Sequence, residues 1–240
     1  MKQPKTCLFT PCFLDGADPS GSDRFERNIK YLDYYRPLKE ELGFDRFVMA
    51  DNASSPEKLQ ALGGEIMIET EPHGLLGRIA DGICGDLTVI SYQERLVSGG
   101  GLFYPYCWRA VYAIRHAFDS LGYNKVILVD SDSFILSKRL AGYIKQCNSG
   151  WETFWCKKWQ FPTAELHVLN RDALPVFREF IKTPYMERNG TLMETELPYR
   201  LAACAHELDT DRYGEDRIPQ RPGMDFYSQC PTNIEMRFES

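Results

Sequence analysis

A short apolar run followed by two acids constrains this chain more than any other feature. Residues 125–129 read Lys-Val-Ile-Leu-Val, and Asp130, Ser131, Asp132 and Ser133 follow at once. A continuous apolar run of this length is typical of a strand that is buried on both faces of a parallel sheet. The run therefore predicts that Asp130 and Asp132 lie at the carboxyl edge of a central strand, where α/β proteins bind their ligands.

The alternation of strand-like and helix-like stretches favours an α/β fold with a mixed, mainly parallel central sheet flanked by helices. Strand-like stretches at 7–14, 46–50 and 65–69 alternate with helix-like stretches along the first part of the chain. Such alternation is typical of layered α/β proteins. We expect these three stretches to join residues 125–129 in one sheet.

Helix signals lie between the expected strands. Asp23 and Glu26 form a capping box that should begin one helix, and Pro37 should kink or split it. A short second helix is expected to begin with Ser54 and Glu57 or with Ser55 and Pro56, and a further helix at Pro105. Seven glycines interrupt every pattern in residues 73–101, where we predict a mobile loop region.

Composition narrows the class of protein. The 240 residues carry 28 Lys plus Arg against 34 Asp plus Glu, a net charge of −6, and 43% are hydrophobic. These values suit one globular domain and argue against a disordered chain or a nucleic-acid-binding protein, which needs a basic face. No apolar stretch approaches the length of a transmembrane segment. Eight cysteines without a C-x-x-C pair favour a reducing, cytoplasmic location, with peripheral membrane attachment left open.

The two acids have a chemical partner that fits them. Adjacent carboxylates repel each other unless a proton or a cation relieves them, and Mn²⁺ or Mg²⁺ commonly bridges one or two carboxylates to phosphate oxygens. A plain turn is the alternative interpretation of Asp130 to Ser133. The apolar residues before Asp130, and Phe134 to Leu136 after it, favour a site.

The segment from Arg109 to Leu136 resembles the D-x-D segment of GT-A-type nucleotide-sugar glycosyltransferases. The strand ends at Thr10, Pro11 and Cys12 and at Asp51 and Asn52 resemble the nucleotide-binding half of that family. The resemblance implies one catalytic domain over 1–240, with a nucleotide-binding half at about 1–136 and an acceptor-binding half at about 137–240. It also implies a UDP- or GDP-linked sugar donor and a hydroxyl acceptor, such as a glycan.

The resemblance also implies roles for individual residues. The metal ligands would be Asp130 and Asp132, with His206 as a further candidate. Nucleotide-sugar contacts would come from the strand ends, the helix before the D-x-D and the D-x-D itself: Thr10, Pro11, Cys12, Asp51, Asn52, Arg109, Asp130 and Ser131.

The acceptor hydroxyl needs a general base. Residues 194–201 read Glu-Thr-Glu-Leu-Pro-Tyr-Arg-Leu and resemble the family-2 pattern Glu-Asp-x-x-Leu-x-x-Arg. Aligning Leu197 and Arg200 puts Met193 at the first acid and Glu194 at the second, which supplies the base in that family. Glu194 is therefore preferred over Glu196 as the catalytic base, and an inverting reaction over a retaining one.

Two other functions fit parts of the sequence. A haloacid-dehalogenase-type phosphatase would use Asp130 as nucleophile and Asp132 as acid, but the motif stands late in the chain and Phe134 occupies a position that needs Thr or Val. A non-catalytic protein that binds a nucleotide sugar is the second alternative. The retained acids Asp130, Asp132 and Glu194 favour an enzyme.

Overall fold

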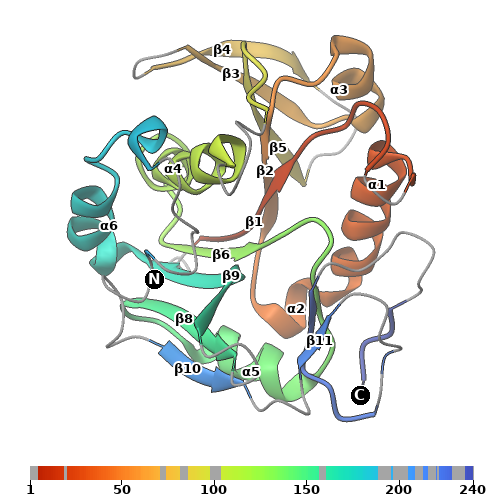
Figure 1. Cartoon of the computed structure of the whole chain (residues 1–240), viewed down its shortest axis with the longest axis vertical. Coiled ribbons are helices and arrows are strands. Elements are labelled where there is room, and N and C mark those ends of the chain that lie inside the picture. Colours follow the sequence, from red (N-terminus) through yellow and green to blue (C-terminus); the bar gives the residue numbers. More distant parts are fainter. Residues whose placement is uncertain are drawn as a thin grey trace.

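The computed structural model describes residues 5–18, 21–70, 74–81, 86–97, 104–156, 161–188, 196, 205–208, 213–215, 220, 222–228 and 236–239. In this part of the chain, helices pack on both faces of a central sheet (Figure 1). No helix among these residues has the length and the apolar character needed to cross a membrane.

The central sheet, as far as the described residues show it, contains nine strands in the order β10-β8-β9-β6-β1-β2-β5-β3-β4. Neighbouring strands from β6 to β3 run parallel, whereas β9 is antiparallel to β6 and β8, and β4 is antiparallel to β3. This confirms the predicted mixed, mainly parallel sheet. The strands are β1 (Thr6–Cys12), β2 (Arg46–Asp51), β3 (Glu65–Thr70), β4 (Gly74–Asp81), β5 (Leu87–Tyr92), β6 (Lys125–Val129), β8 (Trp151–Cys156), β9 (Phe161–Asn170) and β10 (Ala205–Leu208).

A smaller sheet of β11 (Tyr213–Glu215), β12 (Phe226–Ser228) and β7 (Phe134–Ile135) lies beside the end of β6. Strand β7 follows directly after residues 130–133, and β12 pairs with it antiparallel. The segment that carries the two acids is therefore fixed at both ends, by β6 before it and by β7 after it.

Side chains alternate between two cores along each strand. Leu8 and Ile127 face one core, and Phe9 and Leu128 face the other, because successive residues of a strand point to opposite sides. The first core lies under α1 (Arg24–Tyr35), α2 (Lys39–Leu42), α3 (Pro56–Leu62) and α5 (Lys138–Gln146), and the second under α4 (Pro105–Asp119) and α6 (Leu174–Phe180). Short 3₁₀ helices occupy Arg36–Leu38, Arg171–Ala173 and Tyr185–Glu187.

Local sequence signals explain most helix ends. The Asp23 side chain accepts a hydrogen bond from the Glu26 amide at 3.1 Å and begins α1, as predicted. Pro37 lies in the 3₁₀ turn that separates α1 from α2, so the predicted break is confirmed. Pro56 and Pro105 each stand at the first position of a helix, where a missing amide hydrogen costs nothing.

The prediction of a loop region at 73–101 was wrong. Strands β4 and β5 lie within it, and every residue of β5 is buried between β2 and β3. Glycines in and around these strands interrupt the apolar pattern. Strand β4 pairs antiparallel with β3, which directly precedes it in the chain, and β5 is stabilised by pairing with β2 and β3.

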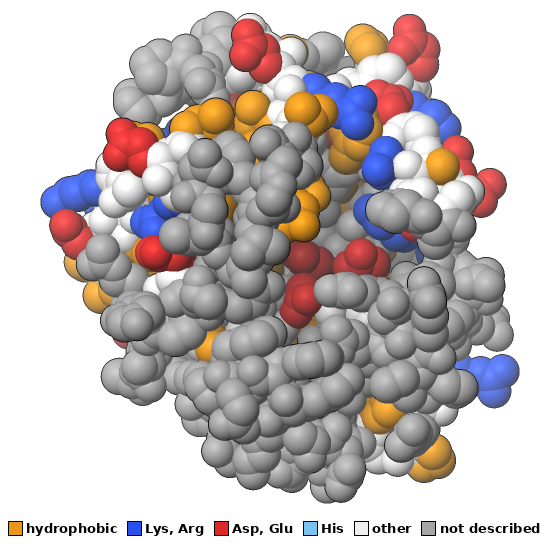
Figure 2. All heavy atoms as spheres, in the orientation of Figure 1, with side chains coloured by type: hydrophobic (Ala, Val, Ile, Leu, Met, Phe, Trp, Pro, Cys, Tyr) orange, Lys and Arg blue, Asp and Glu red, His pale blue; other side chains and the backbone are white. Residues whose placement is uncertain are grey.

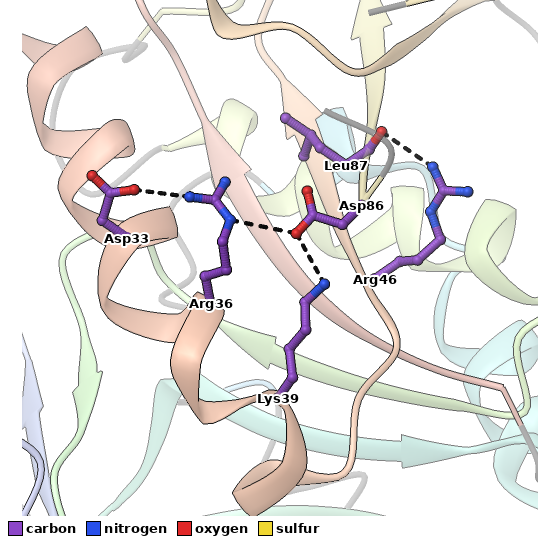
Figure 3. Close-up of polar contacts among 6 residues, drawn as sticks. All are labelled: Asp33, Arg36, Lys39, Arg46, Asp86 and Leu87. Atoms are coloured by element: carbon purple, nitrogen blue, oxygen red, sulfur yellow. Dashed lines mark hydrogen bonds and ion pairs between the residues drawn. The ribbon is translucent and has the colours of Figure 1, made fainter. Parts of the chain in front are cut away.

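A network of hydrogen bonds connects the start of β5 to the end of α1 (Figure 3). Asp86 accepts hydrogen bonds from Lys39 at 2.9 Å and Arg36 at 3.4 Å, and Arg36 also donates to Asp33 at 2.9 Å. This network lies at the amino ends of the parallel strands, because Asp86 immediately precedes β5. It is thus at the opposite edge of the sheet from Asp130 and Asp132.

Candidate active site

The two acids lie in a tight turn at the carboxyl end of β6. The Asp130 amide donates to the Glu165 carbonyl of β9 at 3.1 Å, and the Ser133 amide donates to the Asp130 carbonyl at 2.9 Å. Ser131 and Ser133 are buried, whereas Asp130 and Asp132 are half-buried. The turn therefore presents two carboxylates at the edge of the sheet, as the sequence predicts.

Tyrosines of α1 hold the backbone of this turn. The Tyr31 hydroxyl donates to the Val129 carbonyl at 3.1 Å, and the Tyr35 hydroxyl donates to the Ser133 carbonyl at 3.0 Å. Tyr35 also accepts a hydrogen bond from the Ile135 amide at 2.8 Å. Both rings are fully buried, so the position of the acids is set by a packed helix rather than by the turn alone.

Asp132 lies in an environment that disfavours a lone negative charge. Burial raises the pKa of Asp132, and the nearby Arg27 guanidinium only partly offsets this effect. Arg27 Nη1 lies 3.8 Å from Asp132 Oδ2, and about a third of the Asp132 side chain remains exposed. A carboxylate that is partly desolvated and partly open fits a hard divalent cation, which needs one or two such ligands together with phosphate oxygens.

No three His, Cys, Asp or Glu side chains among the described residues converge to form a complete metal cage. Asp130 and Asp132 stay the candidate protein ligands that the sequence predicts. His206 lies in β10, paired with Phe154 of β8, and its side chain is outside the described part of the structure. Its predicted role as a ligand stays a prediction.

The end of β1 is mostly buried. Thr10 is 1% exposed and Cys12 is 6% exposed, whereas Pro11 between them is half-buried. Burial raises the pKa of the Cys12 thiol well above its usual value, and the Asp51 carboxylate raises it further. These residues reach the same edge of the sheet as Asp51, because Cys12 is paired in register with it. Pro11 is the most accessible of the three.

Asp51 joins the ends of three neighbouring strands. Its carboxylate accepts hydrogen bonds from the Ser54 amide at 2.9 Å, from the Ser54 hydroxyl and from the Ser91 hydroxyl of β5 at 2.8 Å, and the Cys12 thiol lies 3.9 Å away. The side chain is fully buried, and burial raises its pKa. Asp51 therefore organises the strand ends from beneath the surface.

Arg109 and Asn52 fasten the segment after β5 to the end of β2. Asn52 donates to the Leu96 carbonyl at 2.7 Å and accepts hydrogen bonds from the Leu96 amide and from Arg109. Arg109 also donates to the Glu94 carbonyl at 2.8 Å, and its guanidinium lies 4.0 Å from the centre of the Tyr92 ring. With 3% of Arg109 exposed, its described contacts are made within the protein.

Of the two candidate bases, the structure describes Glu196 only. Glu194 lies outside the described residues. Glu196 accepts a hydrogen bond from Arg188 Nη1 at 2.8 Å, and Arg188 is buried against the rings of Trp108 and Phe180. Glu196 is therefore paired with an arginine that packs on α4 and α6, which gives this carboxylate a structural role.

Two residues near the acids were not singled out by the sequence. Arg27 reaches them from α1, and Glu165 lies on β9 beside Asp130, where its carboxylate accepts a hydrogen bond from Ser228 at 2.9 Å. An arginine one turn into an amphipathic helix has the pattern of a solvent-facing charge, and an isolated glutamate in a strand carries no motif. Only the packing of α1 brings Arg27 to Asp132, and only the pairing of β6 with β9 brings the Glu165 backbone to Asp130.

A group of acidic side chains lies near the middle of one face of the molecule. Figure 2, in the orientation of Figure 1, shows these Asp and Glu side chains around the place where β6 ends. Lys and Arg side chains lie on the side nearer α1, and others lie among further acidic side chains at the opposite border of the face. The middle of the face thus offers carboxylates for a cation, with basic side chains on the side of α1.

Solved structures share this architecture. An active-site mutant of the galactosyltransferase LgtC aligns with a TM-score of 0.51 and 10% identity over 94% of this chain and 87% of the other. The chain has a GT-A-type fold. A glycosyltransferase involved in the glycosylation of the major capsid of PBCV-1 aligns with a TM-score of 0.49 and 10% identity, over 95% of this chain and 93% of that one.

A third structure is the mannosyltransferase PcManGT from Pyrobaculum calidifontis in complex with GDP-Man and Mn²⁺. It aligns with a TM-score of 0.49 and 12% identity, over 96% of this chain and 58% of that one. No protein-family model and no curated protein sequence matches the chain. At 10–12% identity the likeness concerns the fold alone.

Proposed function

We propose that this GT-A-type chain is a metal-dependent glycosyltransferase that moves a sugar from a UDP- or GDP-linked donor to a hydroxyl of a glycan or a similar acceptor. The observation that carries the proposal is the position of Asp130 and Asp132, half-buried at the carboxyl end of the central strand β6. Ligands of open α/β sheets bind at this edge. The fold favours this function over the phosphatase alternative.

In this proposal Asp130 and Asp132 hold Mn²⁺ or Mg²⁺, with His206 as a further candidate ligand. The bound ion would supply positive charge for the diphosphate that leaves the sugar. The burial that raises the pKa of Asp132 supports the assignment, because a cation relieves the cost of its charge. Ser131, between the two acids, is assigned to the donor site with them.

The strand ends would form the nucleotide side of the site. Pro11 is open to a ligand, and Thr10 and Cys12 shape the surface from below. Asp51, Asn52 and Arg109 were predicted as direct contacts. Their buried hydrogen bonds to β5 and to neighbouring loops favour an indirect role, in which they hold the strand ends and the segment after β5 in place for the donor.

Glu194 remains our proposal for the catalytic base that removes the acceptor proton. The ion pair between Glu196 and Arg188 supports this choice over Glu196, since a carboxylate that neutralises a buried guanidinium is a poor proton acceptor. If Glu194 activates the acceptor hydroxyl for direct attack on the sugar, the reaction would invert the anomeric configuration. A cytoplasmic location is likewise proposed, and it is supported by the free thiols of Cys7, Cys12 and Cys147.

A thermal-shift assay tests donor binding. UDP or GDP should raise the melting temperature when Mn²⁺ or Mg²⁺ is present and have little effect in EDTA, because the metal joins carboxylate to diphosphate. Asp132→Asn should remove most of this shift. Asp33→Asn is the matched control, since Asp33 is an exposed acid at the opposite edge of the sheet. An equal shift in EDTA, or in Asp132→Asn, would contradict the metal assignment.

A transfer assay then separates binding from chemistry. Glu194→Gln should leave the metal-dependent thermal shift intact while sugar transfer falls by about 10²- to 10⁴-fold, the usual contribution of a general base. Inversion is read from the anomeric configuration of the product. If the wild-type protein binds the nucleotides but transfers or hydrolyses no sugar nucleotide, the non-catalytic binding protein becomes the better account.

A further inference from the structure

Arg27 connects three segments that meet at the candidate site. It lies on α1, one turn after the Asp23 cap, and its guanidinium extends to the carboxyl edge of the sheet. Nη1 lies 3.6 Å from Asp18 Oδ2 in the loop after β1, and 3.8 Å from Asp132 Oδ2 after β6. The contact with Asp132 puts this cation next to one of the two proposed metal ligands.

The guanidinium is incompletely satisfied in this position. Both ion-pair distances exceed the 2.7–3.2 Å of a normal N–H···O hydrogen bond. Within the part of the chain that the structure describes, Arg27 Nε is buried and has no hydrogen-bond partner. A buried donor without an acceptor is costly, so a ligand that brings an acceptor to Nε is favoured here. The edge formed by Nε and a terminal nitrogen is the one that binds phosphate in a bidentate manner.

Two further arginines surround the same place. The guanidinium carbons of Arg95 and Arg24 lie 4.1 Å and 5.4 Å from the centre of the Phe13 ring, in the loop that follows β1. Burial lowers the pKa of Arg24, and the positive charges of Arg27 and Arg95 lower it further. The three arginines are thus close enough to raise the local positive potential, which attracts an anion.

We propose that Arg27 binds the diphosphate of the nucleotide donor. Before a divalent cation binds, Arg27 is paired with Asp132 and Asp18, and the cation then replaces it beside Asp132. This inference rests on the proposed function and adds a donor-binding residue that reaches the site from α1. In the absence of the cation, Arg27 neutralises part of the charge on Asp132. When a cation binds there, it repels Arg27 and competes with it for the same carboxylate, so the guanidinium becomes available to phosphate oxygens.

The proposal predicts changes of opposite sign in one variant. Arg27→Met removes the competing charge, so the protein without nucleotide should bind Mn²⁺ about three- to tenfold more tightly. The same variant loses charged hydrogen bonds to the diphosphate, so UDP or GDP in saturating Mn²⁺ should bind about 10- to 100-fold more weakly. The affinity of Arg27→Met for the free nucleosides uridine and guanosine should equal that of the wild-type protein.

Isothermal titration calorimetry measures both affinities. Arg36→Met is the matched control: Arg36 follows the same helix and contacts two carboxylates, Asp33 and Asp86, but at the opposite edge of the sheet (Figure 3). It should change neither affinity. Arg27→Lys keeps the positive charge and should recover part of the diphosphate affinity, and it serves as the test if Arg27→Met does not fold by circular dichroism.

The possible results separate this inference from the proposed function. If the wild-type protein binds neither UDP nor GDP in Mn²⁺, both fail. If it binds them and the Arg27 variants bind them equally well, only the role of Arg27 fails. If metal and nucleotide affinities fall together, Arg27 acts by holding Asp132 and Asp18 in place, and the proposal is overturned.

Discussion

His167 should make the folded protein sensitive to mild acid. The side chain is 3% exposed on β9, and its Nδ1 accepts a hydrogen bond from Trp151 Nε1 at 3.1 Å. Burial lowers the pKa of His167 to about 4, against a smaller opposing effect of the Ala164 carbonyl. The neutral ring is therefore part of the folded core.

The sign and size of the effect follow from the two pKa values. In the unfolded chain His167 takes up a proton near pH 6.5, whereas the folded protein does so near pH 4. Between these values the unfolded state binds more protons, so the free energy of unfolding falls as the pH falls. Each pKa unit of difference corresponds to about 1.4 kcal/mol, which gives a loss of about 3 kcal/mol across the window. Above pH 6.5 His167 contributes no pH dependence.

The test compares the wild-type protein with His167→Gln, whose amide cannot titrate but can accept the Trp151 hydrogen bond. Urea unfolding at several pH values from 8 to 4 gives the free energy of unfolding of both proteins. At pH 8 the variant should be less stable by about 1–2 kcal/mol, because the fit of the ring is lost. This difference should shrink and then reverse as the pH falls. A difference that stays constant from pH 8 to pH 4 would refute the reasoning.

Two other substitutions test the structural duties assigned above. Glu196→Gln should lower the free energy of unfolding by about 1–2 kcal/mol, because it removes the carboxylate that pairs with the buried Arg188. Sugar transfer by the folded variant should persist. Loss of transfer with unchanged stability in urea would instead identify Glu196 as the base. Asp51→Asn replaces an acceptor of three hydrogen bonds by a group with one acceptor oxygen, and we expect a loss of about 1–3 kcal/mol in the same urea assay. Wild-type stability of Asp51→Asn would show that the strand ends do not depend on this carboxylate.

The sequence alone determined the features that depend on neighbouring residues. The apolar run of β6 and the acids after it predicted both a central strand and the position of the candidate site. The Asp23 cap, the break at Pro37 and the proline that begins α4 were readable because capping and proline geometry act within one helical turn. The family resemblance likewise depended on short contiguous motifs, and the GT-A-type fold agrees with it.

Tertiary structure decided what depends on residues far apart in the chain. Strand β5 is stable because β2 and β3 flank it, and Arg27 faces Asp132 only because α1 packs beside the end of β6. Asp51 and Arg109 resemble ligand-binding residues in the sequence, and the fold buries both and directs their described hydrogen bonds to β5 and to the segment that follows it. Burial and pairing depend on the packing of the whole chain. A local pattern can therefore predict that a charged residue lies at the edge of a sheet, but it cannot predict whether the side chain contacts a ligand or the protein.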